Sequence, residues 1–309
     1  MFVHPQVQAF LDGIPAADSA PPIDEQRKAF SELWRALSPP PAPGVTRREV
    51  CFPGPAGDVP ALVYQPEGAG DGLPVLLFLH GGGCVTLRPA DFDATSTWLA
   101  REGNCAVVVP AYRQAPENPF PAPLDDCVAV YRALCRGAGG IGDPNRIAVA
   151  GDSAGGYLAA ALCLDALTAG LPQPLAQILI YPMLDMASKS VSRVSRDYFL
   201  SDAALEGVIA LHAGTDLLNP RVSPLRARDV RGLARAHVIT TNLDPLEDEA
   251  IAWVERLRLA GVDASCFRYE GMVHGFFSFG GIIDAGMDAV QHVAGMLRAT
   301  WLRATAGTP

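Results

Sequence analysis

The sequence predicts an α/β protein with a mainly parallel β-sheet. Short apolar segments recur along the chain, and from the third segment onward they are continuously apolar instead of alternating. Segments with helical periodicity separate them. Strands that are apolar on both faces and are joined by helices are typical of a parallel sheet covered on both sides. The expected strands, about eight in number, are 49–52, 61–65, 74–79, 105–110, 146–150, 176–181, 236–241 and 264–269.

Helices are expected before, between and after these strands. An amphipathic helix is expected within 24–38, where apolar residues recur at helical spacing on one face: Phe30, Leu33, Trp34 and Leu37. The helices that connect or follow the later strands are expected at 91–102, 124–136, 154–169, 246–260 and 284–303.

The spacing of the strands breaks once, between Tyr181 and Ala236, where the segment 201–214 has a helical pattern. An insertion is therefore expected to lie over the sheet at this point. We divide the chain into an N-terminal helical cap segment (1–45), a first part of the core (46–185), a cap insertion (186–225) and a second part of the core (226–309).

Length, composition and charge exclude several classes of protein. Of the 309 residues, 49% are hydrophobic and 18% charged, so a folded chain with one core is expected. The net charge of −9 argues against binding nucleic acid, which requires clustered Lys and Arg. No apolar run approaches the roughly 20 residues that span a bilayer, so no membrane segment is expected. The N-terminus has no leader pattern, which favours a cytoplasmic protein. No cysteines or histidines have metal-ligand spacing, so no metal is expected.

Ser153 is the candidate nucleophile. It lies in Gly-Asp-Ser-Ala-Gly, directly after an expected strand and before an expected helix. This GxSxG pattern at a strand-to-helix turn is typical of a nucleophile elbow, in which two glycines, here Gly151 and Gly155, let the backbone crowd around the serine. The alternative interpretation is an ordinary glycine-rich turn in which Ser153 caps the helix.

A second glycine-rich segment, formed by His80, Gly81, Gly82 and Gly83, follows the expected strand 74–79. Three consecutive glycines at the end of a buried strand leave backbone N–H groups free to stabilise a negatively charged oxygen in a transition state. The alternative, a phosphate-binding loop, lacks the lysine that normally follows such glycines.

A serine nucleophile requires a base, and the base requires an orienting acid. His274 follows the last expected strand and is the histidine expected in a loop at the site. Asp244 follows the strand 236–241, at the edge of the sheet where α/β proteins gather their sites, and is favoured over Glu247 one turn later. The order Ser153, Asp244, His274 along the chain is the order found in α/β hydrolases.

These motifs resemble those of the bacterial hormone-sensitive-lipase-like family of esterases. The resemblance covers about residues 45–300 and rests on HGGG, YRQAPENPFPAPLDD, GDPNRIAVAGDSAGG, YPMLD, NPRVSPL, DPLEDEA and VHGFF. It implies an α/β-hydrolase fold with an eight-stranded sheet and a helical cap, carboxylic ester hydrolase activity and no cofactor. It also implies that the backbone N–H groups of Gly82, Gly83 and Ala154 form the oxyanion hole, and that His80, with Gly81, supports this loop.

The sequence departs from the family pattern beside the oxyanion glycines. Where the family has an aromatic residue and then a glycine after HGGG, this chain has Cys84 and Leu87, and the family's YRLAPE reads YRQAPE. The candidate residues of the substrate pocket are Cys84, Val85, Leu205, Ile209 and Phe276.

The predicted function is a serine carboxylesterase that hydrolyses short-chain acyl esters, because a pocket roofed by two cap segments favours small substrates. An amidase or arylformamidase that uses the same residues stays open. A ligand-binding receptor, as in the plant gibberellin receptors that resemble this family, is less favoured because those receptors lack the histidine found here at His274. A lipase for large substrates is also less favoured, since no long apolar lid is evident. The sequence leaves both a monomer and a homodimer open.

Overall fold

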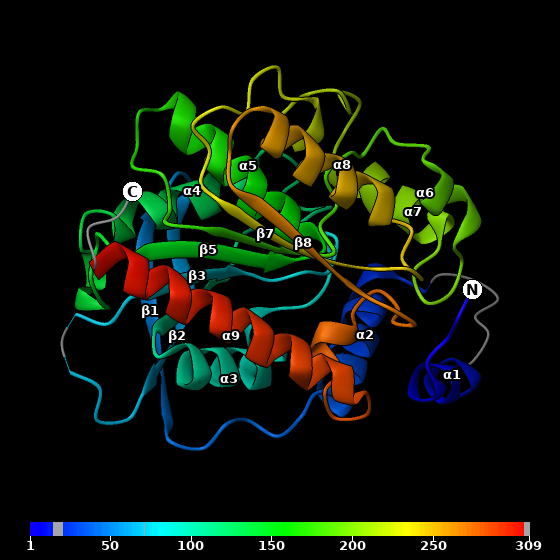
Figure 1. The fold of residues 1–309 in the computed structure, drawn as a ribbon, viewed down its shortest axis with the longest axis horizontal. Coiled ribbons are helices and arrows are strands. Elements are labelled where there is room, and N and C mark those ends of the chain that lie inside the picture. The colour runs from blue at the N-terminus through cyan, green and yellow to red at the C-terminus, as the bar shows by residue number, and fades with distance from the viewer. Residues whose placement is uncertain (15–20, 71, 306–309) are drawn as a thin grey trace.

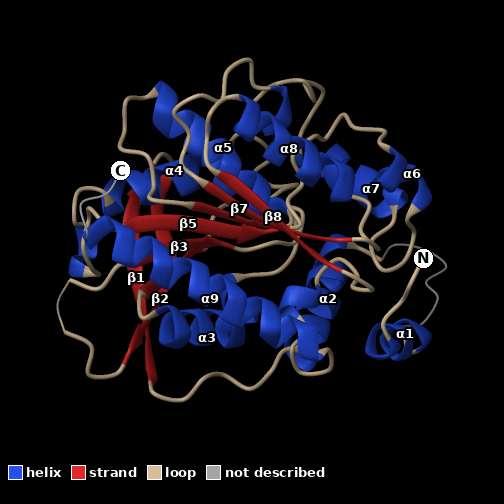
Figure 2. Ribbon diagram, viewed as in Figure 1, coloured by secondary structure: helices blue, strands red, loops and turns tan. Residues whose placement is uncertain are grey.

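The computed structural model describes residues 1–14, 21–70 and 72–305. In this part of the chain an eight-stranded sheet forms the centre of the molecule, with the strand order β1-β2-β4-β3-β5-β6-β7-β8 (Figure 1, Figure 2). Strand β2 pairs antiparallel with β1 and β4, and the remaining neighbours are parallel. The strands are β1 Val45–Gly54, β2 Gly57–Pro66, β3 Val75–Leu79, β4 Ala106–Pro110, β5 Ile147–Asp152, β6 Gln177–Ile180, β7 Ala236–Thr241 and β8 Ala264–Tyr269. The predicted eight-stranded, mainly parallel sheet is confirmed.

The central strands are buried on both faces. Every residue of β3, β4, β5 and β6 is buried. Successive residues of β3 pack into different cores, since Leu77 and Leu79 belong to one apolar cluster and Leu76 and Phe78 to another. Because side chains alternate across a strand, the continuous apolar runs of the sequence build one core on each face of the sheet.

Helices cover both faces (Figure 1). Helices α4, α5 and α8 pack on one face, and α3 and α9, which also contact each other, pack on the other. Among the described residues no helix is long and apolar enough to cross a membrane. The bounds of these helices are α3 Asp93–Gly103, α4 Ala122–Leu134, α5 Ala154–Thr168, α8 Glu247–Leu259 and α9 Asp284–Thr305.

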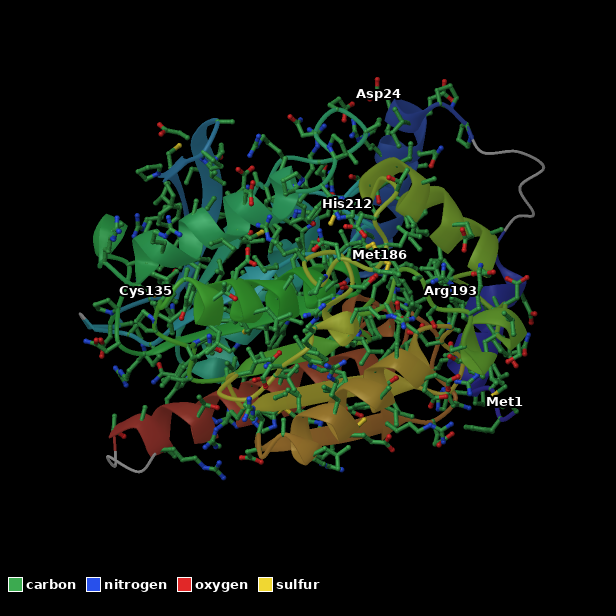
Figure 3. The ribbon with its side chains drawn as sticks, turned by 90° about the horizontal axis from the view of Figure 1, so that it is seen from above. Met1, Asp24, Cys135, Met186, Arg193 and His212 are labelled. Carbon is green, nitrogen blue, oxygen red and sulfur yellow. The ribbon has the colours of Figure 1, made fainter. Side chains whose placement is uncertain are left out.

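Two further groups of helices lie at one end of the sheet. The first group, α1 and α2, precedes β1, and the second group, α6 and α7, lies between β6 and β7. Figure 3 shows Asp24 of α2 and Arg193 of α6 on the side of the molecule away from Cys135, with His212 of α7 nearer the middle. The bounds are α1 Pro5–Asp12, α2 Ile23–Leu37, α6 Val191–Ser195 and α7 Asp202–His212.

The apolar face predicted for α2 is wrong at one position. Trp34 and Leu37 are buried, but Phe30 is 38% exposed. The side of α2 that contacts the core instead includes Arg27, whose guanidinium donates to the carbonyl oxygen of Val85 at 2.9 Å. The helical spacing of apolar residues did not predict this contact, because it takes no account of charged side chains. A long arginine can pack its aliphatic part against the core while its guanidinium binds a backbone carbonyl.

Candidate active site

Three polar side chains meet at the carboxyl ends of the parallel strands. Ser153 follows β5, Asp244 follows β7 and His274 follows β8. The Oγ of Ser153 lies 2.8 Å from Nε2 of His274, and Nδ1 of His274 lies 2.7 Å from Oδ2 of Asp244. Parallel strands end at the same edge of a sheet, which is why residues far apart in the sequence meet here. The structure thus brings together the three residues that the sequence singled out.

Ser153 occupies a strained turn between β5 and α5. Its φ of 55° and ψ of −120° lie outside the regions that non-glycine residues prefer, at a cost of about 1–3 kcal/mol. Hydrogen bonds hold this turn, because the N–H of Ser153 donates to Ile180 at 2.9 Å and its carbonyl accepts from Tyr157 at 3.1 Å. Its side chain makes no capping bond to α5, so the alternative of a helix-capping serine is excluded.

Two glycines permit the turn. A Cβ atom at Gly151 would lie 2.2 Å from the carbonyl oxygen of Gly155, and one at Gly155 would lie 1.8 Å from that of Leu79. Both contacts are with backbone, which cannot move aside without displacing α5 or β3. The N-terminal end of α5 can therefore approach the sheet closely, and its positive end faces the site.

Asp244 is fully buried, and both of its carboxylate oxygens are occupied. Oδ2 contacts the imidazole, and Oδ1 accepts the N–H of Leu246 at 2.8 Å. Glu247, the alternative acid, instead pairs with two arginines, Arg196 and Arg268. The geometry therefore favours Asp244 as the partner of the imidazole.

Tyr181 contacts His274 and was missed in the sequence. The two rings lie 4.6 Å apart between centroids at an angle of 52°. Tyr181 directly follows β6, is buried, and has a φ of 36°, in the left-handed region that side-chain-bearing residues seldom adopt. The position of Tyr181 at the end of a strand was the signal available in the sequence. The spacing of residues along the chain does not show which side chain its ring would contact. The contact restricts the rotation of the imidazole.

The glycine loop after β3 presents unpaired backbone donors. Gly82 and Gly83 have φ values of 101° and 66°, which glycine adopts without strain. Within the described residues, the backbone N–H groups of Gly82, Gly83 and Ala154 have no hydrogen-bond acceptor in the protein. A site that stabilises an oxyanion requires free donors of this kind.

His80 holds this loop in place through its ring and its carbonyl group. Its Nδ1 lies 2.8 Å from the carbonyl oxygen of Gly81, and its ring stacks on that of Tyr112 with 4.4 Å between the ring centroids. The hydroxyl of Tyr112 donates to the carbonyl oxygen of His80 at 2.7 Å. Burial lowers the pKa of His80 to about 4, so at neutral pH the uncharged ring can donate to Gly81. Tyr112 had not been predicted to take part.

Asp152 links the nucleophile turn to the glycine loop. Its Oδ1 accepts the N–H of Gly81 at 2.8 Å, and the side chain is buried. Burial raises the pKa of Asp152 to about 7, against the opposing effects of the Gly81 hydrogen bond and of His274. The two loops that carry the candidate nucleophile and the candidate donors are therefore held together by one carboxyl group.

The five predicted pocket residues are all buried, and four of them belong to the two apolar clusters. Cys84, Leu205 and Ile209 belong to the cluster that contains α5, whereas Phe276 belongs to the opposite cluster. Val85 is 1% exposed. Burial also raises the pKa of the Cys84 thiol. The assignment of these five side chains to a substrate pocket stays a prediction.

Val208 of α7 was missed, although it lies directly on the glycine loop. A Cβ atom built on Gly83 would lie 2.8 Å from Cγ1 of Val208. No pattern in the sequence distinguishes Val208, because it is one apolar residue among several in the segment 201–214. Helix α7 thus contacts a candidate oxyanion donor.

No group of three or more His, Cys, Asp or Glu side chains that could hold a metal ion occurs in the described part of the chain. The histidines near the site, His80 and His274, each contact protein groups instead.

Comparison with known proteins decides the family. A family model described as the alpha/beta hydrolase fold matches residues 76–278. The chain belongs to the α/β-hydrolase family. Esterase LipI of Mycobacterium tuberculosis is 32% identical over 94% of this chain and 92% of its own length. Carboxylesterase NlhH of the same species is 32% identical over 96% of both chains. Ethyl acetate hydrolase of Pseudomonas putida is 31% identical over 96% of this chain and 99% of its own length.

Solved structures of esterases agree with this result. An α/β-hydrolase from the metagenome of Lake Arreo, LAE6, superposes with a TM-score of 0.92 at 35% identity, covering 97% of this chain and 99% of that chain. The Pyrobaculum calidifontis esterase superposes with a TM-score of 0.89 at 31% identity, covering 96% of this chain and 98% of that chain. The α/β-hydrolase fold, the resemblance to this esterase family and the prediction of a carboxylic ester hydrolase are confirmed.

Proposed function

We propose that this α/β hydrolase is a serine carboxylesterase that cleaves short-chain acyl esters through Ser153, His274 and Asp244. The observation that carries the proposal is the continuous chain of contacts from Oγ of Ser153 to Nε2 of His274 and from Nδ1 to Asp244. In this arrangement a base lies within hydrogen-bond reach of the hydroxyl, and an acid holds the base in one orientation.

The first half of the reaction forms an acyl-enzyme. His274 takes the proton of Ser153 as Oγ attacks the ester carbonyl carbon, and Asp244 stabilises the imidazolium. The carbonyl oxygen becomes an oxyanion, which the N–H groups of Gly82, Gly83 and Ala154 stabilise. The C–O bond then breaks as His274 gives its proton to the leaving alcohol.

The second half repeats these steps with water. His274 removes a proton from the water molecule as it attacks the acyl carbon, and the same donors stabilise the second oxyanion. The bond to Oγ breaks, Ser153 regains its proton from His274, and the carboxylic acid leaves. No cofactor takes part in either half.

The preference for short acyl groups follows from the cap. Val208 of α7 packs on Gly83, and Arg27 of α2 binds the carbonyl of Val85 just beyond the glycines. An added methylene gains about 0.8 kcal/mol only while there is room for it, after which overpacking reverses the gain. The Pseudomonas putida relative is named for a small ester, ethyl acetate, which agrees with a small pocket.

A fluorophosphonate probe and a series of p-nitrophenyl esters test the proposal. The probe should label Ser153 in the wild type and should not label Ser153→Ala, which should lose at least about 10⁴-fold in kcat. The ester series should peak at a few acyl carbons. A wild type that neither reacts with the probe nor hydrolyses esters would favour a receptor, and faster cleavage of a matched amide would favour the amidase. The cytoplasmic location stays a prediction, and both a monomer and a homodimer stay open.

A further inference from the structure

The turn that follows the oxyanion glycines contains two strained residues. Cys84 and Leu87 have φ values of 58° and 62°, in the left-handed region, although both carry side chains. A residue with a Cβ atom adopts this region only where surrounding contacts hold it there. The turn therefore needs an external support.

This turn sets the direction of one candidate oxyanion donor. The carbonyl oxygen of Gly82 accepts from the N–H of Val85 at 3.0 Å, from the N–H of Thr86 at 2.8 Å and from the hydroxyl of Thr86 at 3.1 Å. The C=O of Gly82 and the N–H of Gly83 belong to one planar trans peptide and point in opposite directions. Holding the carbonyl within the turn thus directs the N–H of Gly83 away from the turn.

Gln114, in the loop after β4, supplies the support. Its Nε2 donates to the carbonyl oxygen of Thr86 and to that of Leu87, at 2.9 Å each. The amide of Gln114 therefore holds both Leu87, which is strained, and Thr86, which binds the carbonyl of Gly82. The neighbouring backbone is fastened to the same turn, because the N–H of Ala115 donates to the carbonyl of Cys84 at 2.9 Å.

We propose that Gln114 is a positioning residue for the oxyanion hole, which acts by holding the 82–87 turn so that the N–H of Gly83 faces the developing oxyanion. The inference rests on the proposed esterase function. Gln114 touches neither substrate nor Ser153 in this role. Because an oxyanion donor acts on the transition state, disturbing its direction lowers kcat while leaving ground-state binding of the ester largely intact.

Gln114→Met tests the proposal, since methionine matches the length of glutamine but donates no hydrogen bond. We expect kcat for p-nitrophenyl butyrate to fall by about 10- to 100-fold, with KM within about twofold of the wild type. The affinity for a butylboronic acid, which forms a tetrahedral adduct, should fall in parallel with kcat. Adding Leu87→Gly should recover most of the loss, because glycine adopts a positive φ without strain.

Gln173→Met is the matched control. The amide of Gln173 also joins two segments, donating to the carbonyl of Cys163 in α5 at 2.9 Å and accepting from the N–H of Ala234, before β7, at 3.0 Å, and makes no hydrogen bond to the glycine loop. This variant should change the melting temperature and leave kcat within about twofold. If Gln114→Met does not fold, Gln114→Asn, which withdraws the amide by one methylene, is measured in its place.

The outcomes distinguish a failure of the positioning role of Gln114 from a failure of the proposed esterase function. Loss of kcat without change in KM, parallel loss of boronate affinity and recovery by Leu87→Gly support the positioning role. An active wild type together with an unchanged kcat in the Gln114 variant overturns this role alone, as does an equal loss in the Gln173 control. A wild type that is inactive and unlabelled by the fluorophosphonate overturns both the esterase and the positioning role.

Discussion

Replacing Glu249 by glutamine should remove a pH dependence from the stability of the fold. Glu249 lies in α8 and is buried against the segment that follows β6. Its Oε1 accepts the N–H groups of Leu184 and Asp185, at 2.5 and 3.3 Å, and within the described residues its Oε2 has no partner. Burial raises the pKa of Glu249 to about 8, with the hydrogen bonds to Leu184 and Asp185 opposing the rise, the negative Asp185 adding to it and Arg193 opposing it.

The raised pKa of Glu249 makes the folded chain less stable as pH rises. The pKa of Glu249 is higher in the folded chain than its ordinary value of 4.5, so the folded chain holds a proton that the unfolded chain releases between about pH 4.5 and pH 8. The contribution to stability is fully present below this window and is lost as pH rises through it. The slope is about 1.4 kcal/mol in the free energy of unfolding per pH unit.

Urea unfolding of the wild type and of Glu249→Gln, from pH 5.5 to pH 8, measures this slope. Glutamine keeps the acceptor for Leu184 and does not titrate, so the wild type should lose stability relative to the variant by about 1.4 kcal/mol per pH unit. The difference in the free energy of unfolding between the two proteins cancels the contributions of Asp152, His80 and other titrating groups that both proteins share.

The control is Glu255→Gln, which removes one carboxylate from an exposed position of the same helix. Its stability relative to the wild type should stay constant across the same pH range. A difference between the wild type and Glu249→Gln that stays constant with pH, or that favours the wild type as pH rises, would refute the reasoning.

The acid, the buried thiol and the cap each give a further measurable outcome. Asp244→Asn should lower kcat by about 10⁴-fold, because the imidazole loses its orienting charge, whereas Glu247→Gln should lower it by less than about tenfold. Steady-state kinetics measures both, and the reverse ranking would assign the acid to Glu247. Cys84 in the native enzyme should resist N-ethylmaleimide, because burial raises the pKa of its thiol, and it should react after denaturation. Peptide mass spectrometry measures this, and native modification of Cys84 would contradict its burial. Val208→Ala should raise kcat/KM for p-nitrophenyl octanoate relative to the acetate by about tenfold, because it removes methyl groups above the glycine loop. An unchanged chain-length profile would show that α7 does not bound the pocket.

The candidate triad could be predicted from the sequence because each member lies at or shortly after the end of a recognisable strand. Once the apolar runs define parallel strands, Ser153, Asp244 and His274 must lie at one edge of the sheet, and their order along the chain selects among the alternatives. What remained open was the distance between them, which depends on the turn at Ser153 and on the packing of Tyr181. Both residues adopt positive φ values that local propensity disfavours.

The pocket and the supports of the glycine loop could not be predicted in the same way. Two of the three positions that depart from the family pattern, Leu87 and Gln114, are joined in the structure, because the amide of Gln114 donates to the carbonyl of Leu87. That pairing connects loops after different strands, and no periodicity relates them. Val208 likewise reaches Gly83 only through the path of the insertion, which the helical pattern of its segment does not define.

These contacts couple the shape of the pocket to the rate of the reaction. The side chain of Val208 packs on Gly83, and Arg27 of α2 holds the carbonyl of Val85, which lies in the turn that orients Gly82. Movement of either cap helix therefore acts on the same peptide group that is proposed to stabilise the oxyanion. Since misdirecting one such donor costs about 10²-fold or more in kcat, a cap loosened to admit longer acyl chains lowers the rate on short ones. For the proposed esterase we therefore expect substrate range and rate to depend on one group of contacts, so that a variant gains a wider substrate range at full rate only where a second change restores the turn.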